Sequence, residues 1–121
     1  MKRGLLLACL LPAFAFAGNA ERGRELALAR IDGGCLLCHA IPGAERPAGN
    51  IGPSLAGIGS RRDERQLREQ IRDASRFNPE TVMPPYGRTD GLYSVAPRYR
   101  GKPLLSEQQI EDLAAFLATL R

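Results

Sequence analysis

Cys35-Leu36-Leu37-Cys38-His39 is the stretch that decides the fold of this chain, because it gathers two thiols and one imidazole within five residues. Side chains three and four residues apart share one face of a helical turn. Cys35, Cys38 and His39 stand at positions i, i+3 and i+4, so a single turn would present all three on one side. Other groups of this kind are scarce: the chain has one histidine, three cysteines and two methionines.

The pattern matches C-x-x-C-H, the attachment signature of c-type haem. Two thiols on one face reach two vinyl groups of a porphyrin from the same side, and the imidazole then lies over the iron. We therefore predict one covalent haem c held by Cys35 and Cys38, with His39 as an axial ligand. The alternatives are a disulfide or redox pair beside an incidental histidine, and a zinc site. A structural zinc site needs four ligands, and the chain has no second Cys or His cluster.

The second axial ligand follows by elimination. Because no other imidazole exists in the chain, the thioether of Met83 is the best remaining candidate; it lies 44 residues after His39 and directly before Pro84 and Pro85. Methionine also fills gaps in apolar cores, but the prolines and the absence of helical spacing favour a ligand held at a fixed distance. Ligation by His39 and Met83 would raise the reduction potential relative to two nitrogen ligands. Lys102 or a water molecule is the alternative ligand.

Residues 1–17 have the composition of a secretory signal peptide. Two cations precede an apolar stretch at residues 4–16, and Ala15-Phe16-Ala17 is a small-residue cleavage site. The apolar stretch is too short to cross ~30 Å of hydrocarbon, which takes roughly 20 residues. A lipoprotein signal ending at Cys9 would have a very short apolar region. We predict export to the periplasm and a single mature domain over residues 18–121 without a membrane span.

Removal of the predicted signal lowers the formal net charge from +4 to +2, because it takes away Lys2 and Arg3 and no acidic residue. Haem propionates would lower the charge further. Nucleic acid is therefore not an expected partner. Cys9 is removed as well, which leaves Cys35 and Cys38 as the cysteines of the mature protein.

Three helices are predicted around two loops. The first spans residues 19–31, with Asn19 as its N-cap; the second spans residues 60–77, capped by Ser60. The last begins after Ser106, with Gln109 completing a capping box. The loops at residues 41–59 and 81–102 are rich in Gly and Pro, and loops of this length in a small domain are usually functional. No segment has sustained strand alternation, so an all-α fold is expected. Few large apolar side chains are available for its core, and a haem would fill it.

The order of these motifs resembles that of class I cytochromes c. The haem motif comes first, followed by Ile51-Gly52-Pro53-Ser54-Leu55, then Met83-Pro84, then the final amphipathic helix. The resemblance implies the class I cytochrome c fold, with helices and long loops wrapped around one haem. It also implies that the backbone carbonyl of Pro53 accepts a hydrogen bond from His39 Nδ1–H, which leaves Nε2 for iron.

The same resemblance makes two further assignments. Leu55 joins Pro53 among the haem-binding residues. Gly23 and Phe116 match the positions at which the first and last helices of the family cross, where glycine permits close backbone approach.

The chain is more closely similar to the SoxX family, the monohaem subunits of SoxAX complexes in bacterial thiosulfate oxidation. The Asn-Pro-x-Thr-x-Met-Pro loop and the Arg-Gly-Lys-Pro segment distinguish this family from other cytochromes. The segments that carry the resemblance are Gly34–Pro42, Gly49–Leu55, Asn78–Gly87, Tyr99–Leu105 and Ile110–Leu120.

This resemblance implies a heterodimer with the larger cytochrome SoxA. The SoxAX heterodimer would be an L-cysteine S-thiosulfotransferase, in which SoxA joins thiosulfate to the SoxYZ carrier. Sulfur transfer needs a thiolate nucleophile, and haem would occupy both mature cysteines. This chain would therefore be the non-catalytic subunit, passing electrons one at a time to a downstream cytochrome. One alternative is a free-standing respiratory electron carrier. Another is a haem enzyme or gas sensor with an open sixth site, but the presence of Met83 argues against this class.

Arginines crowd the predicted second helix. Arg68, Arg72 and Arg76 lie at i, i+4 and i+8, with acidic residues between them. This patterning predicts a solvated helix face. Docking to an acidic partner is the alternative.

Overall fold

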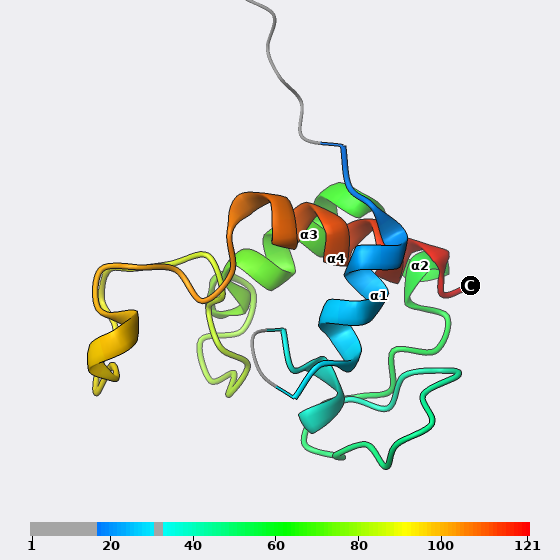
Figure 1. The fold of residues 1–121 in the computed structure, drawn as a ribbon, viewed down its shortest axis with the longest axis horizontal. Helices are drawn as coiled ribbons and strands as arrows, with labels where there is room; N and C mark the ends of the chain where they lie inside the picture. The colour runs from blue at the N-terminus through cyan, green and yellow to red at the C-terminus, as the bar shows by residue number, and fades with distance from the viewer. Residues whose placement is uncertain (1–16, 31–32) are drawn as a thin grey trace, which may run out of the picture.

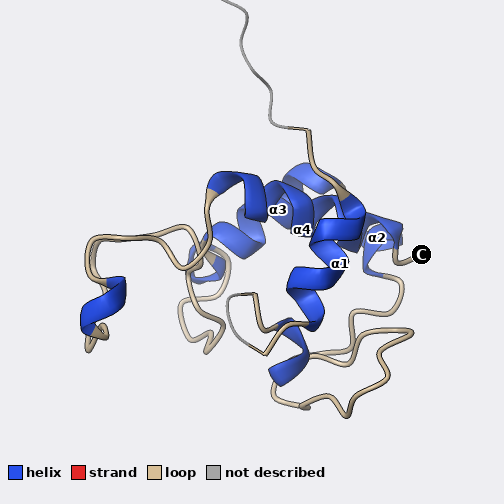
Figure 2. Ribbon diagram, in the orientation of Figure 1, coloured by secondary structure: helices blue, strands red, loops and turns tan. Residues whose placement is uncertain are grey.

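The computed structural model describes residues 17–30 and 33–121, and all regular structure in these residues is helical (Figures 1 and 2). The predicted all-α class is therefore confirmed. The predicted signal peptide lies almost entirely outside the described residues. In chain order the elements are α1 (Ala20–Leu28), η1 (Cys35–Leu37), α2 (Ile58–Arg61), α3 (Glu64–Arg72), η2 (Ala74–Arg76), η3 (Pro97–Tyr99) and α4 (Glu107–Thr119).

The centre of the fold is the crossing of α1 and α4 (Figure 1). A Cβ atom at Gly23 would lie 1.9 Å from the backbone oxygen of Asp112 and 2.8 Å from the Cβ of Phe116. Only a residue without a side chain lets the two helices approach this closely. The crossing expected at Gly23 and Phe116 is therefore present.

Helix α4 contributes more buried residues to the core than any other helix of the described chain. Ser106 and Gln109 form the predicted capping box, with Ser106 Oγ accepting from Gln109 N and Gln109 Oε1 accepting from Ser106 N. Leu105 and Ile110, on either side of the cap, are both fully buried, as a hydrophobic staple requires. The buried side chains of α3, Leu67 and Ile71, belong to the same apolar cluster.

The predicted helix over residues 60–77 is wrong in its boundaries. Arg62 is extended and separates α2 from α3. Asp63, not Ser60, is the N-cap: its carboxylate accepts from Gln66 N, and Gln66 Oε1 accepts from Asp63 N. Asp73 ends the helix in an extended conformation, because its side chain instead accepts a hydrogen bond from Ser75 N. These Asp residues compete locally with helix continuation.

The first helix is also shorter than predicted. Asn19 caps it through Arg22 N, as expected, but α1 ends at Leu28 because Ala29 is extended. Residues 17–19 lie against α4: Gln108 Nε2 donates to the carbonyl of Ala17 at 3.0 Å. Within the described part of the chain, no helix is long and apolar enough to cross a membrane.

Candidate functional site

The two thiols and the imidazole are set on one tight turn. Gly34, in the left-handed conformation at φ 51°, starts η1. The backbone N–H groups of Cys38 and His39 then donate to the carbonyl of Cys35 at 3.1 and 2.9 Å. This turn places Cys35, Cys38 and His39 within one loop of backbone, and both thiols are free and partly buried.

The segment at residues 49–55 is hydrogen-bonded along its length to the Cys-x-x-Cys-His turn. Three backbone hydrogen bonds join them: Gly49 N to Leu36 O at 3.0 Å, Gly52 N to Cys38 O at 2.8 Å, and Leu55 N to Ala40 O at 2.9 Å. The loop predicted from composition is thus irregular but held in a defined register against the Cys-x-x-Cys-His turn. Its register determines which loop residue faces His39.

The residue that faces the imidazole is Pro53. Its carbonyl oxygen lies 2.6 Å from His39 Nδ1. A carbonyl only accepts, so Nδ1 carries the proton and Nε2 retains its lone pair for a metal. The hydrogen bond implied by the family resemblance is therefore present.

Gly52 supports the same ring and was not singled out from the sequence. A Cβ atom here would lie 2.4 Å from His39 Cε1 and 2.6 Å from Nδ1. The backbone of Gly52 thus packs against the imidazole at a distance that no side chain permits. The Gly-Pro pair is the sequence feature that indicates this role: the glycine admits the ring and the proline orients it.

Tyr86 connects the irregular segment at residues 81–88, which we call the methionine loop because it contains Met83, to the haem motif. Sequence reasoning also missed this role of Tyr86. Its hydroxyl donates to the carbonyl of Gly33 at 2.8 Å, and its own carbonyl accepts from Leu105 N at 3.1 Å. Burial, with a smaller contribution from the nearby thiols of Cys35 and Cys38, raises the pKa of Tyr86 to about 12. The phenol is therefore a neutral donor at physiological pH.

Met83 lies in an irregular segment close to the apolar core. Its backbone N–H donates to Thr81 Oγ1 at 3.2 Å. Its side chain is partly buried and packs against the same apolar cluster as Cys35 and Leu55. The fold therefore brings together around one core three residues predicted to contact the haem. Lys102, the alternative ligand, is exposed.

Arg88, two residues after Tyr86, fastens the same side of the methionine loop to the segment after α3. The Arg88 guanidinium donates to Asp73 Oδ2 at 3.0 Å and to Ser75 Oγ at 3.2 Å, and Gly87 N donates to Arg72 O at 3.0 Å. Asp73 is buried. Hydrogen bonds from Ser75, aided by Arg88, outweigh the burial and hold the pKa of Asp73 below its usual value.

The donor set fits a covalently bound haem c. The two thiols stand free rather than paired, and the residues described include no group of three or more His, Cys, Asp or Glu side chains able to hold a metal ion. A zinc site of protein ligands is therefore not formed in this part of the chain. Two reachable thiols, one oriented imidazole and one core-facing thioether match the needs of a thioether-linked porphyrin iron.

Comparison with known proteins supports this fit. The Cytochrome c family model matches residues 20–121. A comparison with curated proteins finds no match. Among solved structures, the chain is similar to SoxXA from P. pantotrophus, with 38% identity, a TM-score of 0.76, and coverage of 86% of this chain and 82% of that one.

A second solved structure, the c-type cytochrome SorU from Sinorhizobium meliloti, shares the fold at 24% identity and a TM-score of 0.53, over 84% of this chain and 88% of that one. The family match spans nearly all of the described residues, and the predicted resemblance to SoxX is confirmed by the match to SoxXA. The chain therefore belongs to the cytochrome c family, as an all-α cytochrome of the SoxX type with a single covalently bound haem c.

Proposed function

We propose that this chain is the electron-transfer subunit of a periplasmic SoxAX-type heterodimer. The observation that carries the proposal is the 38% identity to a chain of SoxXA over most of both sequences. In this role the partner is a larger SoxA-like cytochrome, which couples thiosulfate to a SoxYZ-type carrier. Electrons from that coupling pass through this chain to a downstream cytochrome.

Each residue at the site would have a different part in holding the haem. Cys35 and Cys38 would bond the porphyrin, and His39 and Met83 would be the axial ligands, with Leu55 against the same apolar core. Pro53 keeps the proton of His39 on Nδ1, and Gly52 admits the ring. The bound haem iron supplies one-electron chemistry.

The sulfur chemistry would belong to the partner. A nucleophilic cysteine must be a thiolate near neutral pH. Burial raises the pKa of the Cys35 thiol to about 11, so even without haem attachment this group would be a protonated thiol, not a thiolate, near neutral pH. Purified alone, the haem-loaded chain should show no thiosulfate-coupling activity, and measurable turnover would contradict this division.

Export would follow from the predicted signal, with cleavage after Ala17. The segment that would become the new N-terminus already packs on α4, where Asn19 N donates to Asp112 Oδ1 at 2.7 Å. Mass spectrometry of the periplasmic protein should give residues 18–121 plus one haem. A retained leader or a cytoplasmic location would contradict the proposal.

Co-purification tests the subunit role directly. The full chain, tagged at its C-terminus and expressed with the larger cytochrome from the same source in a host that matures haem c, should recover that cytochrome in equal amounts. An unrelated exported monohaem cytochrome with the same tag is the control. Recovery of haem-loaded chain alone would favour the free-standing electron carrier instead.

A further inference from the structure

Residues 89–103, which we call the arm, have no part in the haem site described above. This segment leaves the body after Arg88, forms the short η3 turn and returns before α4, standing away from the helices (Figure 1). None of its residues belongs to the buried core cluster. Tyr93 is 93% exposed, the highest value among the exposed large hydrophobic residues. A tyrosine combines a large apolar ring with one polar group, which is why this side chain is enriched at protein interfaces.

The arm also concentrates positive charge. It contains Arg98, Arg100 and Lys102 against one acidic residue, Asp90, and therefore carries +2, the whole formal net charge of residues 18–121. In the described chain, none of these three cations enters an ion pair. The rest of the mature domain is neutral overall.

Arg68 and Arg72 of α3, and Arg76 of η2, differ in this respect. Arg68 pairs with Glu111 at 2.5 Å, and Arg72 pairs with both Glu69 and Glu107. Arg76 also reaches Glu69, at 3.1 Å. The arginine row that the sequence singled out is therefore neutralised within the chain, whereas the three cations of the arm have no acidic partner among the described residues.

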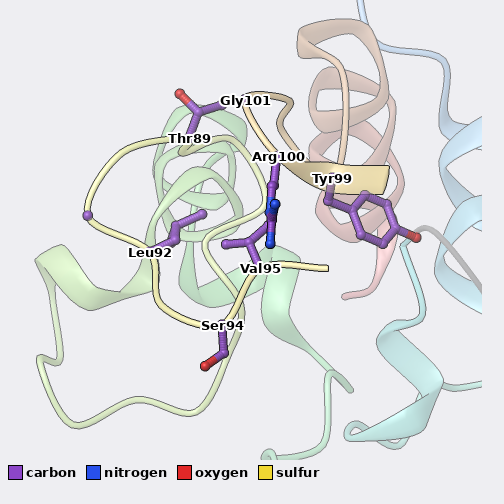
Figure 3. A pocket seen from close by; sticks show the side chains of 8 residues that line it. Thr89, Leu92, Ser94, Val95, Tyr99, Arg100 and Gly101 are labelled. Atoms are coloured by element: carbon purple, nitrogen blue, oxygen red, sulfur yellow. The ribbon is translucent and has the colours of Figure 1, made fainter. Parts of the chain in front are cut away.

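The arm has internal order that would limit the entropy lost on docking. The Arg98 guanidinium lies 5.0 Å from the ring centroid of Tyr99, a cation–π contact. The loop closes around a hollow of about 390 Å³, and Figure 3 shows Arg100 beside Val95 at this hollow. Cations placed in advance lose less freedom when they meet a partner.

We infer that the arm is a docking element for an acidic surface of the larger haem subunit, with Tyr93 as its apolar anchor. Arginine and aromatic side chains dominate the binding energy of protein interfaces, and opposite charge on the partner would steer association. The inference rests on the proposed function and deepens it, because it names the surface through which this subunit is recognised.

Matched charge reversals test the inference on the haem-loaded full chain. Arg98→Glu/Arg100→Glu changes the arm, and Arg62→Glu/Arg65→Glu makes the same change in charge at two exposed arginines beside and within α3. Affinity for the larger cytochrome is measured by calorimetry at low and physiological salt. We expect the arm variant to bind at least about tenfold more weakly at low salt, with a smaller salt dependence, and the α3 variant to remain within about twofold of wild type.

Tyr93→Ser gives an uncharged second test, because loss of an interface anchor should weaken binding about tenfold or more at every salt concentration. Unchanged haem spectra and melting temperature would show that each variant is folded. If wild type binds and the arm variants bind equally well, or if both charge reversals weaken binding equally, the arm inference is overturned while the subunit role stands. If wild type itself binds no larger cytochrome, both are overturned.

Discussion

At the scale of single residues, the site depends on how Pro53 and Gly52 contact the imidazole of His39. The Pro53 carbonyl orients the imidazole through one hydrogen bond of 2.6 Å. Gly52 allows the ring to lie where a Cβ would be 2.4 Å away. Neither residue would contact the iron, yet each limits where Nε2 points.

Gly52→Ala should therefore displace the imidazole. We expect weaker axial ligation by His39, seen as an altered Soret band, a shifted reduction potential and reduced haem-loaded yield. Gly43→Ala is the control: it is strained at φ 76° but meets nothing within 4 Å, so it should cost about 1 kcal/mol of stability and leave the spectrum unchanged. Identical spectra for both variants would contradict the packing role of Gly52.

Met83→Ala should remove the thioether ligand. Loss of methionine ligation lowers the reduction potential and opens the iron to cyanide or imidazole. Val82→Ala is the neighbouring control, because Val82 is 78% exposed. An unaltered potential and spectrum in the Met83 variant would mean that another group is the sixth ligand.

At the scale of elements, loops and helices are joined by buried carboxylates. Asp112 on α4 accepts from Asn19 N, Arg22 Nε and Gln108 Nε2. Asp73, after α3, accepts from Ser75 and Arg88. The first joins α1 to α4, and the second joins the methionine loop to α3.

Asp112→Asn should destabilise the α1–α4 crossing by roughly 1–3 kcal/mol at pH 7, because a buried acceptor is weakened. Burial alone would raise the pKa of Asp112, but its hydrogen bonds from Arg22, Asn19 N and Gln108 together lower it. The stabilisation is thus present above the unfolded pKa of about 3.9 and is lost as pH falls through the lower folded pKa.

Denaturant unfolding of wild type and Asp112→Asn between pH 7 and pH 2 would measure this contribution. The difference in unfolding free energy should shrink as the pH falls. Glu21→Gln, at an exposed residue of α1, should show no such convergence. A difference that is constant with pH would contradict the assignment.

Arg88→Leu should loosen the methionine loop. The variant removes a donor to the buried Asp73 carboxylate, which should cost roughly 1–3 kcal/mol of stability. Because the loop leads back to Met83, imidazole should also bind the ferric protein more readily than in wild type. Arg76→Leu is the matched control, since that side chain is 64% exposed. Equal imidazole affinity in the two variants would show that Arg88 does not position Met83.

At the scale of the whole molecule, the protein core is small and one-sided. Seven residues of α4 are buried, against two each in α1 and α3, and the long segments between helices contribute isolated side chains such as Leu36 and Tyr86. A single large apolar group bonded to the Cys-x-x-Cys turn would join these segments. The fold and the haem are therefore expected to depend on each other.

Cys35→Ala/Cys38→Ala should accordingly abolish covalent haem attachment. Acid–acetone should extract all pigment, and the denatured product should have the mass of the bare polypeptide. The apoprotein should unfold at much lower denaturant than wild type. Wild-type protein that itself loses all pigment to acid–acetone would contradict thioether attachment.

The sequence by itself determined what short spacing controls. The Cys-x-x-Cys-His turn, the Asn19 cap and the Ser106–Gln109 box each depend on residues within five positions of one another, so the local backbone is enough to form them. The inventory of one histidine and one methionine after the predicted signal also limited the candidate ligands. These features predicted both the fold class and the cofactor.

Only the tertiary structure decided the contacts between distant segments. Asn19 meets Asp112 across 93 residues and Tyr86 meets Gly33 across 53, and no periodicity in the sequence encodes such pairs. The same holds for the divided helix at residues 58–76, where side-chain hydrogen bonds of Asp63 and Asp73 replaced helical continuation. Long-range partners are chosen by which surfaces pack once the helices cross, and that choice is a property of the folded chain.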